Sequence, residues 1–464
     1  MSNIDMTSSE VHKNLFRLSV PVLGLTLLSH LGMFVNLGWL AILSNEHNLP
    51  EIFRLVSLIV GVLAATFTGL LSAVYIYANQ AYGRKDHVNA SHLINYGFGL
   101  CLVLGLCVSV FGDLLSQQLL SVFGVDEFIK LQAKKYLNVL WVGYIFILLN
   151  IYSSLLSKMA GDTSMMVRFQ IVSFVVDMIC TPLLILLATR YHFNVVQATA
   201  VAMLIACCSG LLVLFRDFRN FPYRIGIAFW PARGFTENRE MFKLAVAETI
   251  NGFSLNFSFF LFFIVISYYE ASTIVAVTSA QYVMGFFHSL LVGMVAALIP
   301  FTAQNIGAKN LSNIKVGVQW MCKKVLLVAL AIGALTIIFA PYLIDRLAVN
   351  PAQAVNVLSY IRISSLPWAF LIASFPYIFA VVGMGDTKGT MLLTFWSMYL
   401  SNLLPMYLVL HFVGDSTIYA AYAESAAHLL TFIGCFLYYR YKMAKLEQAW
   451  HIESPSTLPL PVAA

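Results

Sequence analysis

Long apolar stretches separated by short polar turns run along the whole chain. Each stretch reaches the length of about 20 residues that a helix needs to cross the hydrocarbon core of a bilayer. The strict two-residue alternation of a membrane β-strand is absent from the sequence. We therefore predict an all-α membrane protein with about twelve transmembrane helices. They are expected at residues 15–43, 53–82, 91–112, 132–157, 166–189, 194–215, 242–268, 272–303, 316–344, 353–382, 390–412 and 417–439.

The composition agrees with this pattern. Hydrophobic residues make up 60% of the chain and charged residues 10%, whereas a soluble domain carries about 25% charged residues. Lipid must therefore cover much of the surface. The 7 cysteines lie inside apolar stretches and form no CxxC pair, so we expect neither a disulfide framework nor a metal site.

The basic residues predict the orientation. When successive turns are assigned to opposite sides of the membrane, most of the 27 Lys and Arg residues share the side of the N-terminus. Because cytoplasmic loops carry this excess, we expect both termini in the cytoplasm and multi-pass insertion in the inner (plasma) membrane. The net charge of +6 then favours membrane lipids as partners, and not nucleic acid.

A long basic loop between Arg216 and Lys243 separates two halves of six spans each. It contains Pro222 and Pro231, which are typical of linkers. We predict a cytoplasmic N-terminal tail at 1–12, an N-lobe with spans 1–6 at 13–220, a cytoplasmic linker at 221–238, a C-lobe with spans 7–12 at 239–443, and a cytoplasmic C-terminal tail at 444–464.

The two halves repeat short motifs at one spacing. A Gln-x-x-Gly turn recurs 224 residues later, and so do a Gly-Asp-Thr turn and a tyrosine early in the fourth span, Tyr136 and Tyr360. Six spans per half give both repeats one orientation, so we expect six-helix bundles related by a pseudo-two-fold axis along the membrane normal. The glycines are expected to form left-handed helix caps and the aspartates to cap the next helix. These structural turns are Gly83, Gly161, Asp162, Gly307, Gly385 and Asp386.

These turns, with Leu18-Ser19-Val20-Pro21 in the first span and Thr181-Pro182-Leu183 in the fifth, resemble the MATE (multidrug and toxic compound extrusion) family over residues 13–443. The resemblance implies a secondary active exporter with two six-helix lobes that alternate in access. It implies lipophilic or cationic substrates, exchanged for protons or sodium ions, and no further cofactor. We expect a monomer.

An ionised side chain in the centre of a span costs about 2.5–3.5 kcal/mol, so such residues are candidates for function. Asp177, in the fifth span, is the candidate for ion coupling. Many family members carry an acid at the position of Asn36 in the first span and another one helical turn after Asp177, where this chain has Thr181. We expect Asp177, Asn36 and Thr181 to form one polar cluster. A structural hydrogen bond to a neighbouring helix is the alternative role for Asp177.

The C-lobe offers a second set of polar candidates for substrate or ions: Glu248, Asn251, Asn256, His288, Glu424 and His428. Glu248 either lines a site with the two asparagines or caps the seventh helix. Glu424 and His428, four residues apart, either pair with each other or relay protons with His288. Pro21 either bends the first span as a gate or sits harmlessly in its first turn. The charged residues do not repeat at the 224 spacing, so we expect coupling first in the N-lobe.

Two other functions compete with export. A flippase for lipid-linked saccharides needs a basic cavity, whereas Lys and Arg are sparse inside these spans. An intramembrane enzyme of the prenyltransferase kind needs clustered acids for Mg²⁺ and diphosphate, and no DDxxD motif occurs. We therefore favour a transporter that is not an enzyme.

Overall fold

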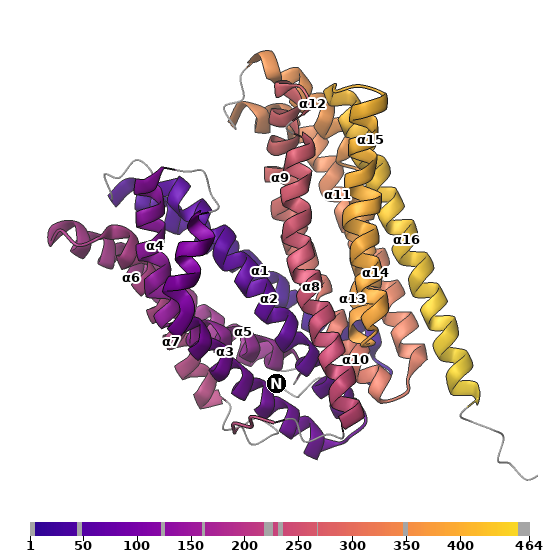
Figure 1. Cartoon of the computed structure of the whole chain (residues 1–464). Helices are drawn as coiled ribbons and strands as arrows, with labels where there is room; N and C mark the ends of the chain where they lie inside the picture. Colours follow the sequence, from indigo (N-terminus) through magenta and orange to yellow (C-terminus); the bar gives the residue numbers. More distant parts are fainter. Residues whose placement is uncertain are drawn as a thin grey trace, which may run out of the picture.

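A computed structural model describes residues 5–43, 49–121, 126–159, 163–217, 226–230, 235–266, 268–346 and 351–452. These residues form helices and connecting turns (Figure 1). The helices are α1 (Val11–Leu43), α2 (Leu49–Gly83), α3 (His87–Ser121), α4 (Glu127–Val142), α5 (Tyr144–Met159), α6 (Thr163–Arg190), α7 (Val195–Asp217), α8 (Phe235–Ile266), α9 (Ala271–Val295), α10 (Leu298–Gly307), α11 (Leu311–Arg346), α12 (Pro351–Ser364), α13 (Trp368–Gly383), α14 (Thr387–Phe395), the π-helix η2 (Trp396–Leu403), α15 (Leu404–Phe412) and α16 (Thr417–Ile452).

Each of the twelve predicted spans corresponds to one of these helices, to a consecutive pair or, for 390–412, to α14, η2 and α15 together. Among the described residues, 9 helices are long and apolar enough to cross a membrane, or 11 when each strongly bent pair counts as one span. The bent pairs are α4 with α5, at 63°, and α12 with α13, at 45°. Both are the fourth span of their lobe, and the breaks at Gly143 and Pro367 are again 224 residues apart. Glycine and proline are frequent causes of such kinks.

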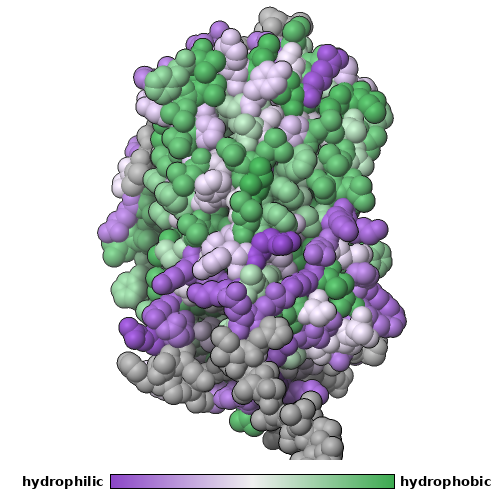
Figure 2. Space-filling view, turned by 90° about the vertical axis from the view of Figure 1, so that its right-hand side faces the viewer, coloured by the Kyte–Doolittle hydropathy of each residue, from purple (hydrophilic) through white to green (hydrophobic). Residues whose placement is uncertain are grey.

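The outer surface fits a lipid environment. Seen from the side of the C-lobe, hydrophobic side chains cover most of the height of the molecule (Figure 2). Hydrophilic side chains gather toward the lower end. An apolar band bounded by polar side chains is what a bilayer-spanning protein requires. The chain is therefore an integral membrane protein.

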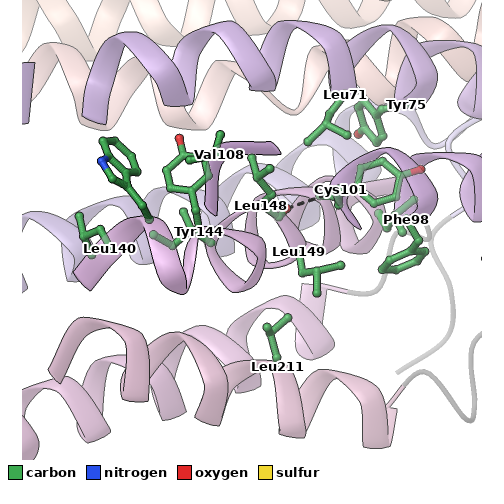
Figure 3. Packing of buried hydrophobic residues seen from close by; sticks show 14 of the residues in the cluster. Leu71, Tyr75, Phe98, Cys101, Val108, Leu140, Tyr144, Leu148, Leu149 and Leu211 are labelled. Atoms are coloured by element: carbon green, nitrogen blue, oxygen red, sulfur yellow. Dashed lines mark hydrogen bonds between the residues drawn. The ribbon is translucent and has the colours of Figure 1, made fainter. Parts of the chain in front are cut away.

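The helices form two bundles, α1–α7 and α8–α16, which diverge from a shared lower end in Figure 1. The N-lobe core joins α2–α7; within it Leu71, Phe98 and Leu148 pack together, and the Cys101 thiol donates to the Leu148 carbonyl at 3.6 Å (Figure 3). Separate apolar clusters fill the C-lobe. The pseudo-symmetric pair of bundles predicted from the repeat is confirmed.

Helix α1 contributes to both lobes. Its first two turns and the residues before them belong to a C-lobe cluster, with Leu15 and Leu18 1% exposed. Met6, in the predicted tail, is also buried there, and its carbonyl accepts from the Asn305 amide at 2.9 Å. From Val22 onward, buried residues of α1 belong to the N-lobe core. The predicted domain boundaries remain predictions, but the packing divides α1 between residues 18 and 22.

The Gln-x-x-Gly turns meet across the pseudo-symmetry axis. A Cβ atom added at Gly83 would lie 2.0 Å from the carbonyl oxygen of Gln304, and one added at Gly307 would lie 2.1 Å from that of Gln80. Each glycine therefore admits the backbone of the other lobe's glutamine. The side chains join the same contact, because the Gln304 amide donates to Asn79 at 3.1 Å. This reciprocal contact closes the lower end of the molecule, where the two lobes meet.

The left-handed conformation expected of Gly83 and Gly307 is found elsewhere. Lys85 and Lys309, two residues later in each repeat, have φ of 61° and 54°. The prediction of left-handed caps at these two glycines is therefore wrong: the missing side chain serves close approach between lobes. Gly385 does adopt positive φ, at 71°. The other two predicted turn residues, Gly161 and Asp162, lie outside the described residues.

The turn before α14 is held by Asp386. Its carboxylate accepts from the Gly389 amide at 3.2 Å, as expected of a helix cap, and from the Tyr438 hydroxyl and the Lys442 ammonium, both at 2.9 Å. Burial opposes ionisation, but Lys442, Tyr438 and Gly389 together hold the pKa of Asp386 below its ordinary value of 3.8. The turn thus ties α14 to the far end of α16.

Replacing this carboxylate should cost stability in a pH-dependent way. Asp386→Asn is expected to lower stability by about 1–3 kcal/mol near neutral pH, because hydrogen bonds to a charged group are lost. A depressed pKa contributes fully above 3.8 and is lost as pH falls through the lower folded-state value. Thermal unfolding of variant and wild type should therefore differ at neutral pH and converge in acid. A difference that persists in acid would contradict this assignment; Lys388→Gln, at an exposed neighbour, is the control.

Candidate functional site

A cavity of about 540 Å³ lies inside the N-lobe. Its volume falls within the range of small-molecule sites, about 300–1,000 Å³. Side chains from α1, α2 and α4–α7 line it. The polar members are Asn36, Ser57, Tyr136, Asn150, Gln170, Ser173, Asp177, Thr181 and Thr199, and Leu28, Phe53, Ile147, Phe174 and Met203 are among the apolar ones.

Asp177 carries the only charged side chain among the described lining residues. The Asn36 amide donates to its Oδ2 at 2.7 Å, and the Thr181 hydroxyl donates to its Oδ1 at 3.0 Å. The structure thus brings together the three residues predicted to form a polar cluster. The carboxyl group of Asp177 thus has two neutral donors and no cationic partner among the described residues of the cavity wall.

The local sequence explains this geometry. Thr181 lies four residues after Asp177, so both side chains point from one face of α6. Gly32, one helical turn before Asn36, lets α1 approach α6: a Cβ atom there would lie 3.2 Å from the Phe174 ring. The close approach of α1 to α6 places the Asn36 amide against the carboxylate.

Several residues of the cavity wall were not predicted from the sequence. Tyr136 was noted only as a repeat of Tyr360, yet it lines the cavity with Asp177. Asn150, Gln170 and Ser173 also line it and were not identified. The 224 spacing of the tyrosines was a usable signal, whereas single polar residues in α5 and α6 gave none.

In the C-lobe, Glu248 lies where α8 crosses the N-lobe. A Cβ atom added at Gly69 of α2 would meet the Glu248 carbonyl at 2.7 Å, and the Thr249 hydroxyl donates to the Thr66 carbonyl at 3.3 Å. Helix α8 begins at Phe235, so the prediction that Glu248 caps it is wrong: the helix extends back over a polar segment. Oε1 of Glu248 and Nδ2 of Asn251 are buried without a partner among the described residues.

The seventh span also contains Asn256, whose side chain lies outside the described part of the structure. The structure therefore places Glu248 and Asn251 in the lobe interface and leaves Asn256 open. A C-lobe site formed by the three remains a prediction.

The remaining C-lobe candidates separate into different contacts. Glu424 accepts a hydrogen bond from the Tyr360 hydroxyl and not from His428, so the pairing of Glu424 with His428 is wrong. Nδ1 of the buried His428 has no partner among the described residues. His288 of α9 lies between aromatic rings, with centroids 6.5 Å from Trp368 and 5.3 Å from Phe375.

Pro21 lies inside α1, ten residues after the helix begins at Val11. The alternative that places it in the first turn is therefore wrong. At an interior position, proline removes one backbone hydrogen bond and favours bending. A gating role remains a prediction.

Comparisons with known proteins agree on one family. The MatE family model matches residues 52–183 and 249–408. The probable multidrug resistance protein YoeA of Bacillus subtilis (strain 168) is 22% identical over 307 residues, or 64% of this chain. The match spans 65% of that relative's own length, which is less than two thirds.

Solved structures share the fold at low sequence identity. A MATE transporter in complex with MaL6 has a TM-score of 0.85 at 17% identity and covers 97% of this chain and 100% of its own. A MOP superfamily transporter from Pyrococcus furiosus Vc1 (DSM3638) has a TM-score of 0.84 at 16% identity, covering 96% and 99%. An outward-facing multidrug resistance MATE family transporter has 0.83 at 18%, covering 97% and 99%. With its twelve-helix, two-bundle fold and its matching repeats, this chain belongs to the MatE family of transporters.

Proposed function

We propose that the protein exports lipophilic, cationic compounds in exchange for an ion that binds at Asp177. One observation carries this proposal: a single carboxylate in the wall of a largely apolar cavity, hydrogen-bonded by Asn36 and Thr181. An apolar wall with one negative group is complementary to a lipophilic cation. The similar proteins that are described as multidrug resistance proteins support drug export as the function.

The coupling follows from competition for one charge. A proton or sodium ion at Asp177 cancels the negative charge of the cavity, so a cationic substrate loses its counter-charge and leaves. Release of the ion on the cytoplasmic side restores the site for the next substrate. Differential affinity of the two ligands for the two lobe arrangements then drives the cycle.

The electrostatics of the cavity disfavour the flippase alternative. No Lys or Arg is among the described residues that line the cavity, and a lipid-linked diphosphate needs cations around its phosphates. The intramembrane enzyme has no supporting observation. We therefore keep ion-coupled export as the function and propose the cell membrane, with cytoplasmic termini, as its location.

Transport by the reconstituted full-length protein tests this proposal. Vesicles are loaded with cationic, neutral and anionic dyes of similar size, and a proton or a sodium gradient is imposed separately. One of the two gradients should accelerate movement of the cationic dye by roughly tenfold over vesicles without a gradient, a coupling of about 1.4 kcal/mol. The anionic dye should not respond. Equal rates for all dyes with and without either gradient would overturn the proposal.

A further inference from the structure

A part-buried acid–tyrosine pair lies in the C-lobe. The hydroxyl of Tyr360 on α12 donates to the carboxylate of Glu424 on α16, and Tyr360 is 1% exposed. None of the ion pairs formed by described residues includes Glu424. A carboxyl group in a span, held by a neutral donor and no cation, is costly unless it exchanges a proton or an ion.

This pair has a counterpart in the N-lobe. Tyr136 and Tyr360 are 224 residues apart, and Tyr136 lines the cavity that contains Asp177. Each lobe therefore places the tyrosine of its fourth span near an acid, although Asp177 comes from α6 and Glu424 from α16. Because the acids stand on non-equivalent helices, the symmetry is visible in the structure but not in the positions of the acids along the sequence.

Three further titratable side chains lie in the same part of the C-lobe as Glu424. His428 lies one turn further along the same face of α16, is 4% exposed, and has an Nδ1 with no partner among the described residues. His288 on α9 is near enough to His428 for their charges to interact. The other nearby titratable side chain is Tyr269, whose hydroxyl donates to the Met406 carbonyl at 2.7 Å.

The remaining elements packed against α16 add no charged partner. Arg362 on α12 is exposed and forms no ion pair with Glu424. No titratable side chain described on α13, α14, η2 or α15 hydrogen-bonds to this carboxylate, and among the described residues only Tyr360 donates to it. Among the described residues, the groups that can influence the protonation of Glu424 are therefore Tyr360, His428 and His288.

We propose that Glu424 is a second proton-binding site, located in the C-lobe and separate from Asp177. A proton from water converts the carboxylate to the acid, and the Tyr360 hydroxyl stabilises the ionised form. The inference goes beyond the proposed function, because it requires neither a substrate nor coupling at Asp177.

Infrared difference spectroscopy of the purified full-length protein in lipid nanodiscs tests this site during a pH titration. We expect a protonated-carboxyl band that appears as the pH falls in wild type, is lost in Glu424→Gln and is retained in Asp177→Asn. Glutamine keeps an oxygen for the Tyr360 hydroxyl, so the fold is preserved. Tyr360→Phe should move the midpoint upward by roughly one pH unit or more, because the ionised form loses its donor.

Two results would overturn the inference. One is a titrating carboxyl band that is identical in wild type and Glu424→Gln. The other is a midpoint that does not change in Tyr360→Phe, a variant that keeps Glu424 and retains the ring that fills the same space. Neither measurement uses transport. If export coupled at Asp177 were disproved, the carboxyl band and its midpoint would still test Glu424.

Discussion

Asp177→Asn is expected to abolish gradient-driven export while the protein still folds. The substitution keeps the size of the side chain and removes the only charge among the described residues that line the N-lobe cavity. The side chains of Asn36 and Thr181 then face a neutral amide in place of the carboxylate. Each hydrogen bond to a charged partner is worth about 1.5–3 kcal/mol, so binding of a coupling ion should fall by roughly tenfold or more.

The measurement is dye efflux from proteoliposomes under the gradient that drives the wild-type protein. Asp113→Asn is the matched control, because Asp113 is an acid of the same lobe that lies half exposed and pairs with Lys134 at 3.2 Å. It should transport normally. Efflux by Asp177→Asn that retains its full gradient dependence would exclude Asp177 as the coupling residue.

Exchanging the two partners of the hydrogen bond gives a sharper test. The Asn36 amide and the Asp177 carboxylate are 2.7 Å apart, so Asn36→Asp combined with Asp177→Asn moves the charge by about one hydrogen bond and keeps the pair. The double variant should recover part of the gradient dependence lost in Asp177→Asn alone. If the double variant and Asn36→Asp both fold normally but show no gradient-dependent efflux, the expected recovery is contradicted. The charge would then be required at position 177 itself.

Adding one methyl group at the reciprocal turn is expected to open the lower end of the molecule. A Cβ atom at Gly83 would lie 2.0 Å from the Gln304 carbonyl oxygen, which belongs to a helix backbone and cannot rotate away. Overpacking of this kind costs about 1–3 kcal/mol. Gly83→Ala should therefore lower the unfolding temperature by several degrees and weaken the contact between the lobes.

Pseudo-symmetry makes the same prediction for Gly307→Ala, whose Cβ atom would lie 2.1 Å from the Gln80 carbonyl oxygen. The control is Gly61→Ala in the same helix as Gly83, where an added Cβ atom meets nothing within 4 Å. Labelling of Ala81→Cys, at a position buried beside the contact, reports opening: it should be faster in both glycine variants than in the control. Equal labelling in all three would contradict the described closure.

The sequence predicted the number of spans, the two bundles and the repeat, because hydropathy and a fixed spacing are properties of the residues along the chain itself. It also predicted the cluster at Asp177, since Thr181 follows by one helical turn and Asn36 stands in the corresponding part of α1. The role of Gly83 was not accessible, because a glycine beside a turn predicts a cap, whereas its contact with Gln304 joins residues far apart in the chain. The hydrogen bond between Tyr360 and Glu424 could not be predicted either, because it depends on how α12 packs against α16.

The two lobes also differ at the position of Asp177, and this difference depends on local structure that the sequence did not predict. The residue 224 positions after Asp177 is Ser401, which lies in the π-helix η2 and shares a hydrogen bond of 2.6 Å with Thr431. A π-helical turn shifts the face that a residue presents, and no acid stands there. At the position that Asp177 holds in the N-lobe, the C-lobe therefore has a packed hydroxyl pair, which no hydropathy pattern distinguishes.

The division of α1 between two cores makes this helix a mechanical linkage. Its start is anchored in the C-lobe core through Leu15 and Leu18, whereas its buried apolar residues from Val22 onward belong to the N-lobe core. Beyond Val22 it also contacts α9, where His30 hydrogen-bonds to Ser289 at 2.8 Å. Pro21 stands at the changeover, next to a segment in which Gly24 has free space around it. If the bundles rotate against each other, we expect α1 to flex at this joint or to withdraw its start from the lower end, and to transmit that displacement along the helix to Asn36.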